Sequence, residues 1–260
     1  MLRGFYTAAS AMHTQEKRLN VYANNIANVG TAGFKRDGLI AGTFGEHMAV
    51  RMNMYQGSPA QDIGPGVFMN TITAEYTDYS QGGPEFTGNP YHFAIMGDGY
   101  FVIQTPDGGT GLTRNGQFAL DEEGYLVLSN YGRVQGEGGD ILLENHRFTV
   151  SQDGMIFLED EEGELNEIDR LLIVMPLGDE GTFKKDENEM FVAAAGFAQV
   201  DPLDAATAVL QNSIERSNVN IADEMSLIIA SQRTLRANGQ ILRMYDELVD
   251  NVNQRISRPR

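Results

Sequence analysis

The chain has 260 residues, of which 42% are hydrophobic and 21% charged, a composition that indicates a folded protein and excludes a disordered one. No cysteine is present, so disulfides and thiolate metal sites are excluded. The formal net charge is −17, and residues 41–212 carry 28 Asp and Glu against seven Lys and Arg, which argues against nucleic acid as a partner because phosphate contacts need a basic surface.

The first predicted element is an amino-terminal helix that ends near residues 28–30, where Gly30 can take the left-handed conformation of a helix cap. Apolar residues recur in it at alternating spacings of three and four, with only Glu16 out of character in the series, which is typical of a helix that packs against another helix. These residues are Leu2, Phe5, Ala9, Met12, Leu19, Ala23 and Ile26. We assign residues 1–41 to this helix and the turn that follows it.

The stretch VYANNIANVGTAGFKRD, residues 21–37, begins as helix and ends as loop. It holds three asparagines, Asn24, Asn25 and Asn28, whereas a helix cap followed by a loop needs only one asparagine and one glycine. Amides both donate and accept hydrogen bonds, and small residues allow close approach. We therefore interpret the stretch as a surface that packs against a neighbouring copy, with Phe34 as an apolar anchor.

The middle of the chain changes from helical to strand-like patterns. Residues 42–84 are rich in Gly, Met, Gln and Tyr and show no steady period, so we expect an extended connection there. Residues 85–195 are expected to form a central antiparallel β domain, either a sandwich or an open barrel, because short strand-like runs alternate with glycine-containing turn signals. Residues 196–212 are then the return connection.

The last predicted element is a long helix within residues 213–260, with Asn220 as its N-cap and Asp223 and Glu224 in its first turn. Its apolar seam is interrupted near Asn238 and Gly239. The seam residues are Ile221, Met225, Ile228, Gln232, Leu235, Leu242, Tyr245, Val249 and Val252. A seam this narrow must be buried against another helix, within one chain or between chains. We therefore predict an α+β fold, with the terminal helices pairing as a coiled-coil domain around a central antiparallel all-β domain.

Residues that could perform chemistry are not arranged in a recognisable site. The four histidines show no zinc-binding spacing, and the acidic runs at residues 121–123 and 159–162 directly precede hairpin glycines, as solvated turn residues do. We expect no catalytic, cofactor or metal site, and no enzyme activity. The alternative is a calcium-binding or glycan-processing surface protein with a β domain, oligomerised by its terminal helices.

Three motifs, in order along the chain, resemble those of the bacterial flagellar rod and hook proteins. ANNIANVGTAGFKRD at residues 23–37 resembles the amino-terminal signature of that family, and TGNPYHFAIMGDGYFVIQTPDGG from residue 87 its central β-domain signature. ERSNVNIADEMSLIIASQRTLRANGQILRMYDEL at residues 215–248 is similar to its carboxyl-terminal helix. The motifs do not separate distal from proximal rod proteins.

The resemblance implies a structural subunit of the flagellar basal body, exported through the flagellar type III apparatus without a cleaved signal peptide. Such subunits assemble helically with copies of themselves and with neighbouring rod and hook proteins into a drive shaft that transmits torque from motor to hook. No cofactor, nucleic acid or small-molecule substrate is implied. The residues expected at contacts between copies are Leu2, Phe5, Met12, Leu19, Asn24, Asn25, Ile26, Asn28, Gly30, Gly33, Phe34, Asn218, Ile221, Met225, Ile228, Gln232, Leu235, Leu242, Tyr245, Val249 and Val252.

Overall fold

The computed structural model divides the chain into two compact units. It describes residues 2–43, 70–106, 108–143, 147–159, 164–176, 183–185, 190–193, 197–199 and 207–256. The first unit, called the helical unit here, comprises Met1–Ala27, Arg36–Asp78 and Val219–Arg260. The second, called the β unit, comprises Asn28–Lys35 and Tyr79–Asn218. Two terminal helices and a mostly antiparallel β region confirm the α+β class.

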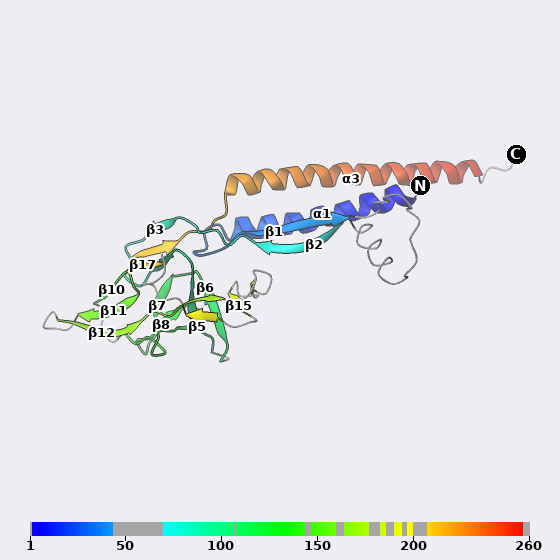
Figure 1. Cartoon of the computed structure of the whole chain (residues 1–260). Coiled ribbons are helices and arrows are strands. Elements are labelled where there is room, and N and C mark those ends of the chain that lie inside the picture. Colours follow the sequence, from blue (N-terminus) through cyan, green and yellow to red (C-terminus); the bar gives the residue numbers. More distant parts are fainter. Residues whose placement is uncertain are drawn as a thin grey trace, which may run out of the picture. The chain divides into compact units, whose positions relative to one another are not determined.

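In its described residues, the helical unit contains two long helices and one hairpin (Figure 1). Helix α1, Leu2–Ala27, lies alongside helix α3, Ile221–Ile256, and also contacts the hairpin. The hairpin consists of β1, Asp37–Thr43, and β2, Asn70–Thr77, paired antiparallel. β1 lies mostly within residues 1–41, which the sequence assigned to the amino-terminal helix and turn, and β2 lies within the predicted extended connection, residues 42–84. Residues 44–69 of that connection fall outside the described residues.

Helix α3 begins where its capping residue predicts. The side chain of Asn220 accepts a hydrogen bond from the backbone N–H of Ala222 at 3.0 Å, and acidic residues occupy the first turn. Near the other end, Tyr245 lies directly over Gly4 of α1, where a β-carbon would come within 2.0 Å of the tyrosine oxygen. Glycine at that position therefore permits Tyr245 to pack closely on α1.

The end of α1 differs from the prediction. The helix ends at Ala27 and is followed by a turn, but Gly30 does not have a positive φ. The left-handed residue of this stretch is Gly33, with φ of 68°. The prediction for Gly30 was wrong because the left-handed conformation is required where the chain meets another segment of the β unit, three residues further on.

The β unit is built from short, antiparallel strands around a buried apolar core (Figure 1). The strands are β3 (Pro84–Phe86), β4 (Phe93–Met96), β5 (Tyr100–Gln104), β6 (Thr110–Thr113), β7 (Phe118–Leu120), β8 (Leu126–Leu128), β9 (Gly132–Val134), β10 (Phe148–Val150), β11 (Met155–Glu159), β12 (Leu165–Arg170), β13 (Ile173–Pro176), β14 (Phe183–Lys185), β15 (Phe191–Ala193), β16 (Phe197–Gln199), β17 (Ala208–Gln211) and β18 (Ser213–Glu215). The largest sheet has the order β14-β15-β6-β5-β9-β8-β7, with β13 joining β5 to β16. Phe93, Phe101 and Ile103 are completely buried in its core.

Three of these strands lie in segments for which the sequence predicted something else. β16 and β17 fall within residues 196–212, predicted as a plain connection, and β18 falls within the segment assigned to the carboxyl-terminal helix. β17 pairs with β4 and β18 with β3, each more than a hundred residues away. Three- and four-residue strands have no detectable period of their own, and their partners determine their conformation.

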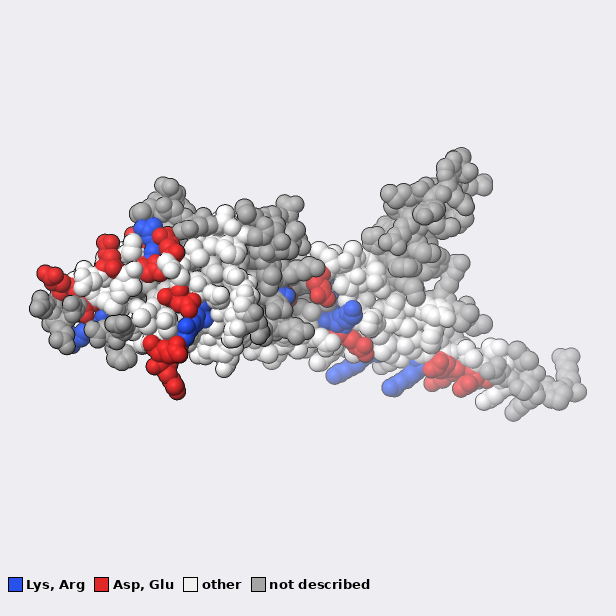
Figure 2. Space-filling view, turned by 90° about the horizontal axis from the view of Figure 1, so that it is seen from below, with Lys and Arg blue, Asp and Glu red and all other residues white. Residues whose placement is uncertain are grey.

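Acidic residues gather over the β unit, interleaved with fewer basic ones (Figure 2). One cluster surrounds Arg133, which pairs with Asp121, Glu123 and Asp140. The side chain of Asp121 also accepts the backbone N–H groups of Glu123 and Tyr125, at 3.0 and 2.8 Å. The predicted acidic turn at residues 121–123 is therefore confirmed, whereas residues 160–162 of the second acidic run lie outside the described residues.

Candidate functional site

The chain passes between the two units four times, after residues 27, 35, 78 and 218. Two of these crossings bracket residues 28–35, which carry the second half of the asparagine- and glycine-rich motif and belong to the β unit. Each crossing segment is held within its own unit by a small set of buried residues.

A buried ion-pair network holds residues 28–35 in the β unit. Glu215, only 1% exposed, accepts hydrogen bonds from Lys35 Nζ at 2.7 Å, from the backbone N–H of Gly82 at 2.9 Å and from Arg114 Nη1 at 3.2 Å. Lys35 also donates to the carbonyl of Ser80 at 2.9 Å. Burying charges is costly unless they are paired and hydrogen-bonded, and here two buried cations share one carboxylate. The network joins four segments that are distant in the sequence.

The two residues before Lys35 are fixed by close contacts. Gly33 donates its N–H to the carbonyl of Glu215 at 2.8 Å, and a β-carbon on it would come within 2.3 Å of the backbone of Arg114. Phe34 is 3% exposed, and the ammonium group of Lys185 lies 3.6 Å from the centre of its ring. The motif Gly-Phe-Lys is thus an anchor within its own subunit.

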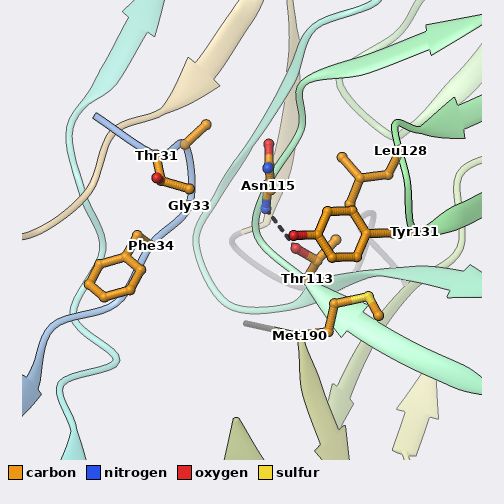
Figure 3. A pocket seen from close by; sticks show the side chains of 9 residues that line it. Thr31, Gly33, Phe34, Thr113, Asn115, Leu128, Tyr131 and Met190 are labelled. Carbon is orange, nitrogen blue, oxygen red and sulfur yellow. Dashed lines mark hydrogen bonds between the residues drawn. The ribbon is translucent and has the colours of Figure 1, made fainter. Parts of the chain in front are cut away.

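A small cavity lies beside this anchor (Figure 3). It is lined by Thr31, Ala32, Gly33, Phe34, Thr113, Asn115, Leu128, Tyr131 and Met190. Its volume is about 30 Å³, which is room for about one water molecule and too small for a substrate or an organic cofactor. In its lining, the backbone N–H of Asn115 donates to the hydroxyl of Thr113, two residues earlier, at 3.0 Å.

Asn25 holds the start of β1 in the helical unit. Its side chain is completely buried, donates to the carbonyl of Asp37 at 2.8 Å and accepts from the N–H of Asp37 at 3.0 Å. One amide thus satisfies both backbone groups of a residue twelve positions away. This arrangement explains one of the three asparagines by a contact within the subunit.

Arg36 pairs with Glu224 in the first turn of α3, with Nε and Oε1 2.5 Å apart. The hydrogen bond to Glu224 raises the pKa of Arg36 above its ordinary value. Consecutive cations, Lys35 and Arg36, therefore bind buried glutamates in different units, Glu215 in the β unit and Glu224 in the helical unit. Each side of this crossing has its own ion pair.

Replacing Asn25 with alanine is expected to lower the free energy of unfolding by about 2–3 kcal/mol, because two hydrogen bonds are lost and two backbone groups lose this partner. Thermal and urea denaturation of the full chain measure the change. The matched control is Asn20→Ala, an exposed position of the same helix, for which we expect a change below about 0.5 kcal/mol. Equal effects of the two substitutions would show that the Asn25 amide does not stabilise the fold.

The structure places the predicted contact residues in three environments. Those buried in their own subunit are Asn25, Gly33 and Phe34. Those half-buried are Met12, Leu19, Ile26, Asn28, Asn218, Ile228, Leu235, Leu242 and Tyr245. Those exposed are Phe5, Asn24, Gly30, Ile221, Met225, Gln232, Val249 and Val252. Leu2 lies in α1, and its side chain is outside the description.

Three of the residues predicted to contact a neighbouring copy are buried within their own chain. Asn25, Gly33 and Phe34 contact groups of the same subunit, and their contact with another copy stays a prediction. Excess asparagine and glycine indicated tight packing, but the sequence did not show that the packing partner is the same chain.

Sequence reasoning missed the charged residues of the ion-pair networks. Lys35 and Glu215 are 180 positions apart, and Arg36 and Glu224 are 188 apart. No spacing rule connects such distant residues. The only local indication in the sequence is that two consecutive cations, Lys35 and Arg36, directly follow Gly33 and Phe34. Exposed apolar residues of α3 outside the predicted seam were also missed, namely Ile229, Ile241, Met244 and Leu248.

The described part of the chain holds no metal site and no membrane-spanning helix. In that part, no three His, Asp or Glu residues are grouped so that they could hold a metal ion. None of its helices is both long and apolar enough to cross a lipid bilayer.

The sequence matches three family models along its length. Residues 5–35 match the flagella basal body rod protein model, residues 94–158 the flagellar hook protein FlgE/F/G D1 domain, and residues 210–255 the flagellar basal body rod FlgEFG protein C-terminal model. The first of these covers most of α1 and the Gly-Phe-Lys anchor, and the third covers β18 and nearly all of α3.

Relatives that match over nearly the whole chain are also flagellar basal-body rod proteins. The chain is 32% identical to the flagellar basal-body rod protein FlgG of Bacillus subtilis over 97% of this chain and 98% of the relative. It is 30% identical to FlgG of Buchnera aphidicola subsp. Baizongia pistaciae over 97% and 99%, and 28% identical to FlgF of Escherichia coli over 99% of both. The chain therefore belongs to the flagellar basal-body rod protein family and is a structural subunit of the rod.

Proposed function

We propose that this rod subunit assembles with further copies of itself into a helical tube through its helical unit. The observation that supports this proposal is the apolar surface of α3. Eight large apolar residues of α3 are 38–54% exposed: Ile221, Met225, Ile229, Ile241, Met244, Leu248, Val249 and Val252. Apolar side chains gathered on one exposed element mark a surface that binds another protein.

Within one subunit, α1 and α3 pair as a coiled-coil core. Seven residues of α3 with reduced exposure follow alternating spacings of four and three: Glu224, Ile228, Ser231, Leu235, Asn238, Leu242 and Tyr245. Leu227 and Gly239 also have reduced exposure, and three of the seven, Glu224, Ser231 and Asn238, are polar. A shaft that transmits torque gains rigidity from many repeated contacts between copies, which the exposed apolar residues supply.

The part of α3 beyond Tyr245 also carries exposed apolar residues that could contact another copy. Tyr245 packs over Gly4 in the first turn of α1, and α3 continues beyond Tyr245 to Ile256. Val249 and Val252 continue the predicted seam beyond this point and are exposed. In the assembled rod we expect these residues to pack on a neighbouring subunit.

The remaining parts of the proposal follow from family membership. We infer export through the flagellar type III apparatus without a cleaved signal peptide, a place in the axial structure across the periplasm, and end contacts with neighbouring rod and hook proteins. Relatives named FlgG and FlgF both match over nearly their full length. The proposal therefore covers both a distal and a proximal position in the rod.

A double substitution of the exposed surface tests the proposed assembly. Met225→Asp together with Leu248→Asp is expected to prevent rod formation, because charges would have to be buried at the contact between copies. Concentration-dependent sedimentation and electron microscopy of the full chain measure assembly, and circular dichroism confirms that the helices and strands are retained. The matched control is Gln240→Asp with Asn251→Asp, two exposed polar positions of the same helix. If the apolar-surface variant still assembles like the control, this surface is not the contact.

A further inference from the structure

Seven of the eight exposed apolar residues of α3, all except Val249, form two separate patches on different flanks of the helix. An α-helix turns by about 100° per residue and rises by about 1.5 Å. Measured from the flank that faces α1, where Glu224, Leu235 and Leu242 lie, the first patch is rotated by about 100° in one direction. It consists of Ile221, Met225 and Ile229, each 50% exposed. We call it the N-terminal patch.

The second patch is rotated by about 115° in the opposite direction. It consists of Ile241, Met244, Leu248 and Val252, which are 38–54% exposed, and we call it the C-terminal patch. Its centre lies about 20 residues beyond the centre of the N-terminal patch, which corresponds to about 30 Å along the helix axis. The two patches therefore differ both in direction and in height.

At the position of each patch along the helix axis, the flank that carries the other patch is not apolar. On the flank of the N-terminal patch, the residues level with the C-terminal patch are exposed and charged: Arg243, Glu247 and Asp250. On the other flank, the residues level with the N-terminal patch are Asp223, Ser226 and Ala230. Two parallel copies at the same height would therefore place Met244 and Leu248 against charged side chains, at the cost of removing those charges from water.

A displacement along the axis removes this mismatch. We propose that α3 binds a second copy of this chain head to tail, with the C-terminal patch of one copy packed on the N-terminal patch of the next. The two helices are parallel and displaced by about 30 Å. This inference rests on the proposed assembly of the chain into a rod and specifies its geometry. Because the two surfaces are different, each new copy again presents a free patch, and the contact extends into an open filament.

Disulfide crosslinking tests the displacement directly, because the chain has no cysteine of its own. Two single variants, Ile229→Cys and Leu248→Cys, are assembled as an equimolar mixture and oxidised. We expect crosslinks between position 229 of one copy and position 248 of another. They should exceed at least tenfold those of the control mixture, Ser226→Cys with Asn251→Cys, whose positions have similar heights but lie outside the patches. Crosslinks mainly between identical positions, 229 to 229 or 248 to 248, would overturn the head-to-tail arrangement.

Mixing two blocked variants gives a second, independent readout. Met225→Asp disables only the N-terminal patch and Leu248→Asp only the C-terminal patch, so each alone should not elongate. Mixed in equal amounts, they should form a dimer with one copy of each, through the remaining intact pair of patches. A dimer formed by either variant alone, or no dimer in the mixture, would refute the proposed contact.

The wild-type chain distinguishes failure of this inference from failure of the proposed function. If the wild type forms rods but the crosslinks join identical positions, the helical assembly stands and the displaced head-to-tail contact is wrong. If the full-length wild type forms no rods at any concentration tested, both the assembly and the contact are wrong.

Discussion

Replacing Glu215 with alanine is expected to lower the free energy of unfolding of the β unit by about 3–5 kcal/mol. Glu215 accepts hydrogen bonds from two buried cations, Lys35 and Arg114, and from the N–H of Gly82. Alanine removes the carboxylate that these groups share and leaves two positive charges in the interior. The loss should therefore far exceed that of an ordinary surface ion pair.

Urea denaturation of the full chain, followed by tyrosine fluorescence, measures this effect. The matched control is Glu85→Ala, because Glu85 pairs with Arg216 at 3.5 Å and both side chains are more than half exposed. We expect the control to change the stability by less than about 1 kcal/mol. A loss for Glu215→Ala no larger than that of the control would show that the buried network does not stabilise the β unit.

Gly33→Ala is the second substitution with a large expected effect. Gly33 has φ of 68°, and a β-carbon there would lie 2.3 Å from the carbonyl carbon of Arg114 and 2.5 Å from its oxygen. The left-handed conformation costs a residue with a side chain about 1–3 kcal/mol, and the contact with a fixed backbone adds a similar amount. We expect a total loss of about 2–5 kcal/mol, with Phe34 and Lys35 displaced from their buried positions.

Gly30→Ala is the matched control, only three residues away in the same motif. Nothing lies within 4 Å of a β-carbon at Gly30, and its φ is not positive. Alanine there should leave the stability unchanged within about 0.5 kcal/mol, or raise it slightly by restricting the unfolded chain. Hydrogen exchange at the amides of residues 31–35 identifies where the loss occurs. Equal protection in Gly33→Ala and the wild type would mean that the anchor tolerates a side chain.

Glu215→Ala and Gly33→Ala both alter contacts that fix residues 28–35 within the β unit. Neither changes a residue of the proposed contact between copies. Destabilised variants of this kind should assemble poorly because the folded subunit is less populated. The surface variants of α3 should instead fold normally and assemble poorly. Comparing unfolding and assembly for the two groups therefore separates the stability of the subunit from the contact that builds the rod.

The sequence alone determined the elements whose signals are local. Alternating spacings of three and four predicted both terminal helices, and Asn220 with two acidic residues after it predicted the start of α3. Turn glycines such as Gly124 and Gly154 have positive φ at the predicted hairpins. These features depend on residues within one or two turns of the chain, and so they can be read from a short window. The family motifs are local in the same sense.

The tertiary structure alone decided which residues are inside the subunit and which remain at its surface. Lys35 pairs with Glu215, 180 positions away, and Asn25 is buried against Asp37 of its own chain. Along α3, the position of α1 covers one flank and leaves Met225 and Leu248 exposed on two others. A helical period in the sequence shows that the apolar stripe of a helix must be buried. It does not show which surface buries it. The free energy of burying a charge or an apolar side chain depends on partners that only the folded chain brings together.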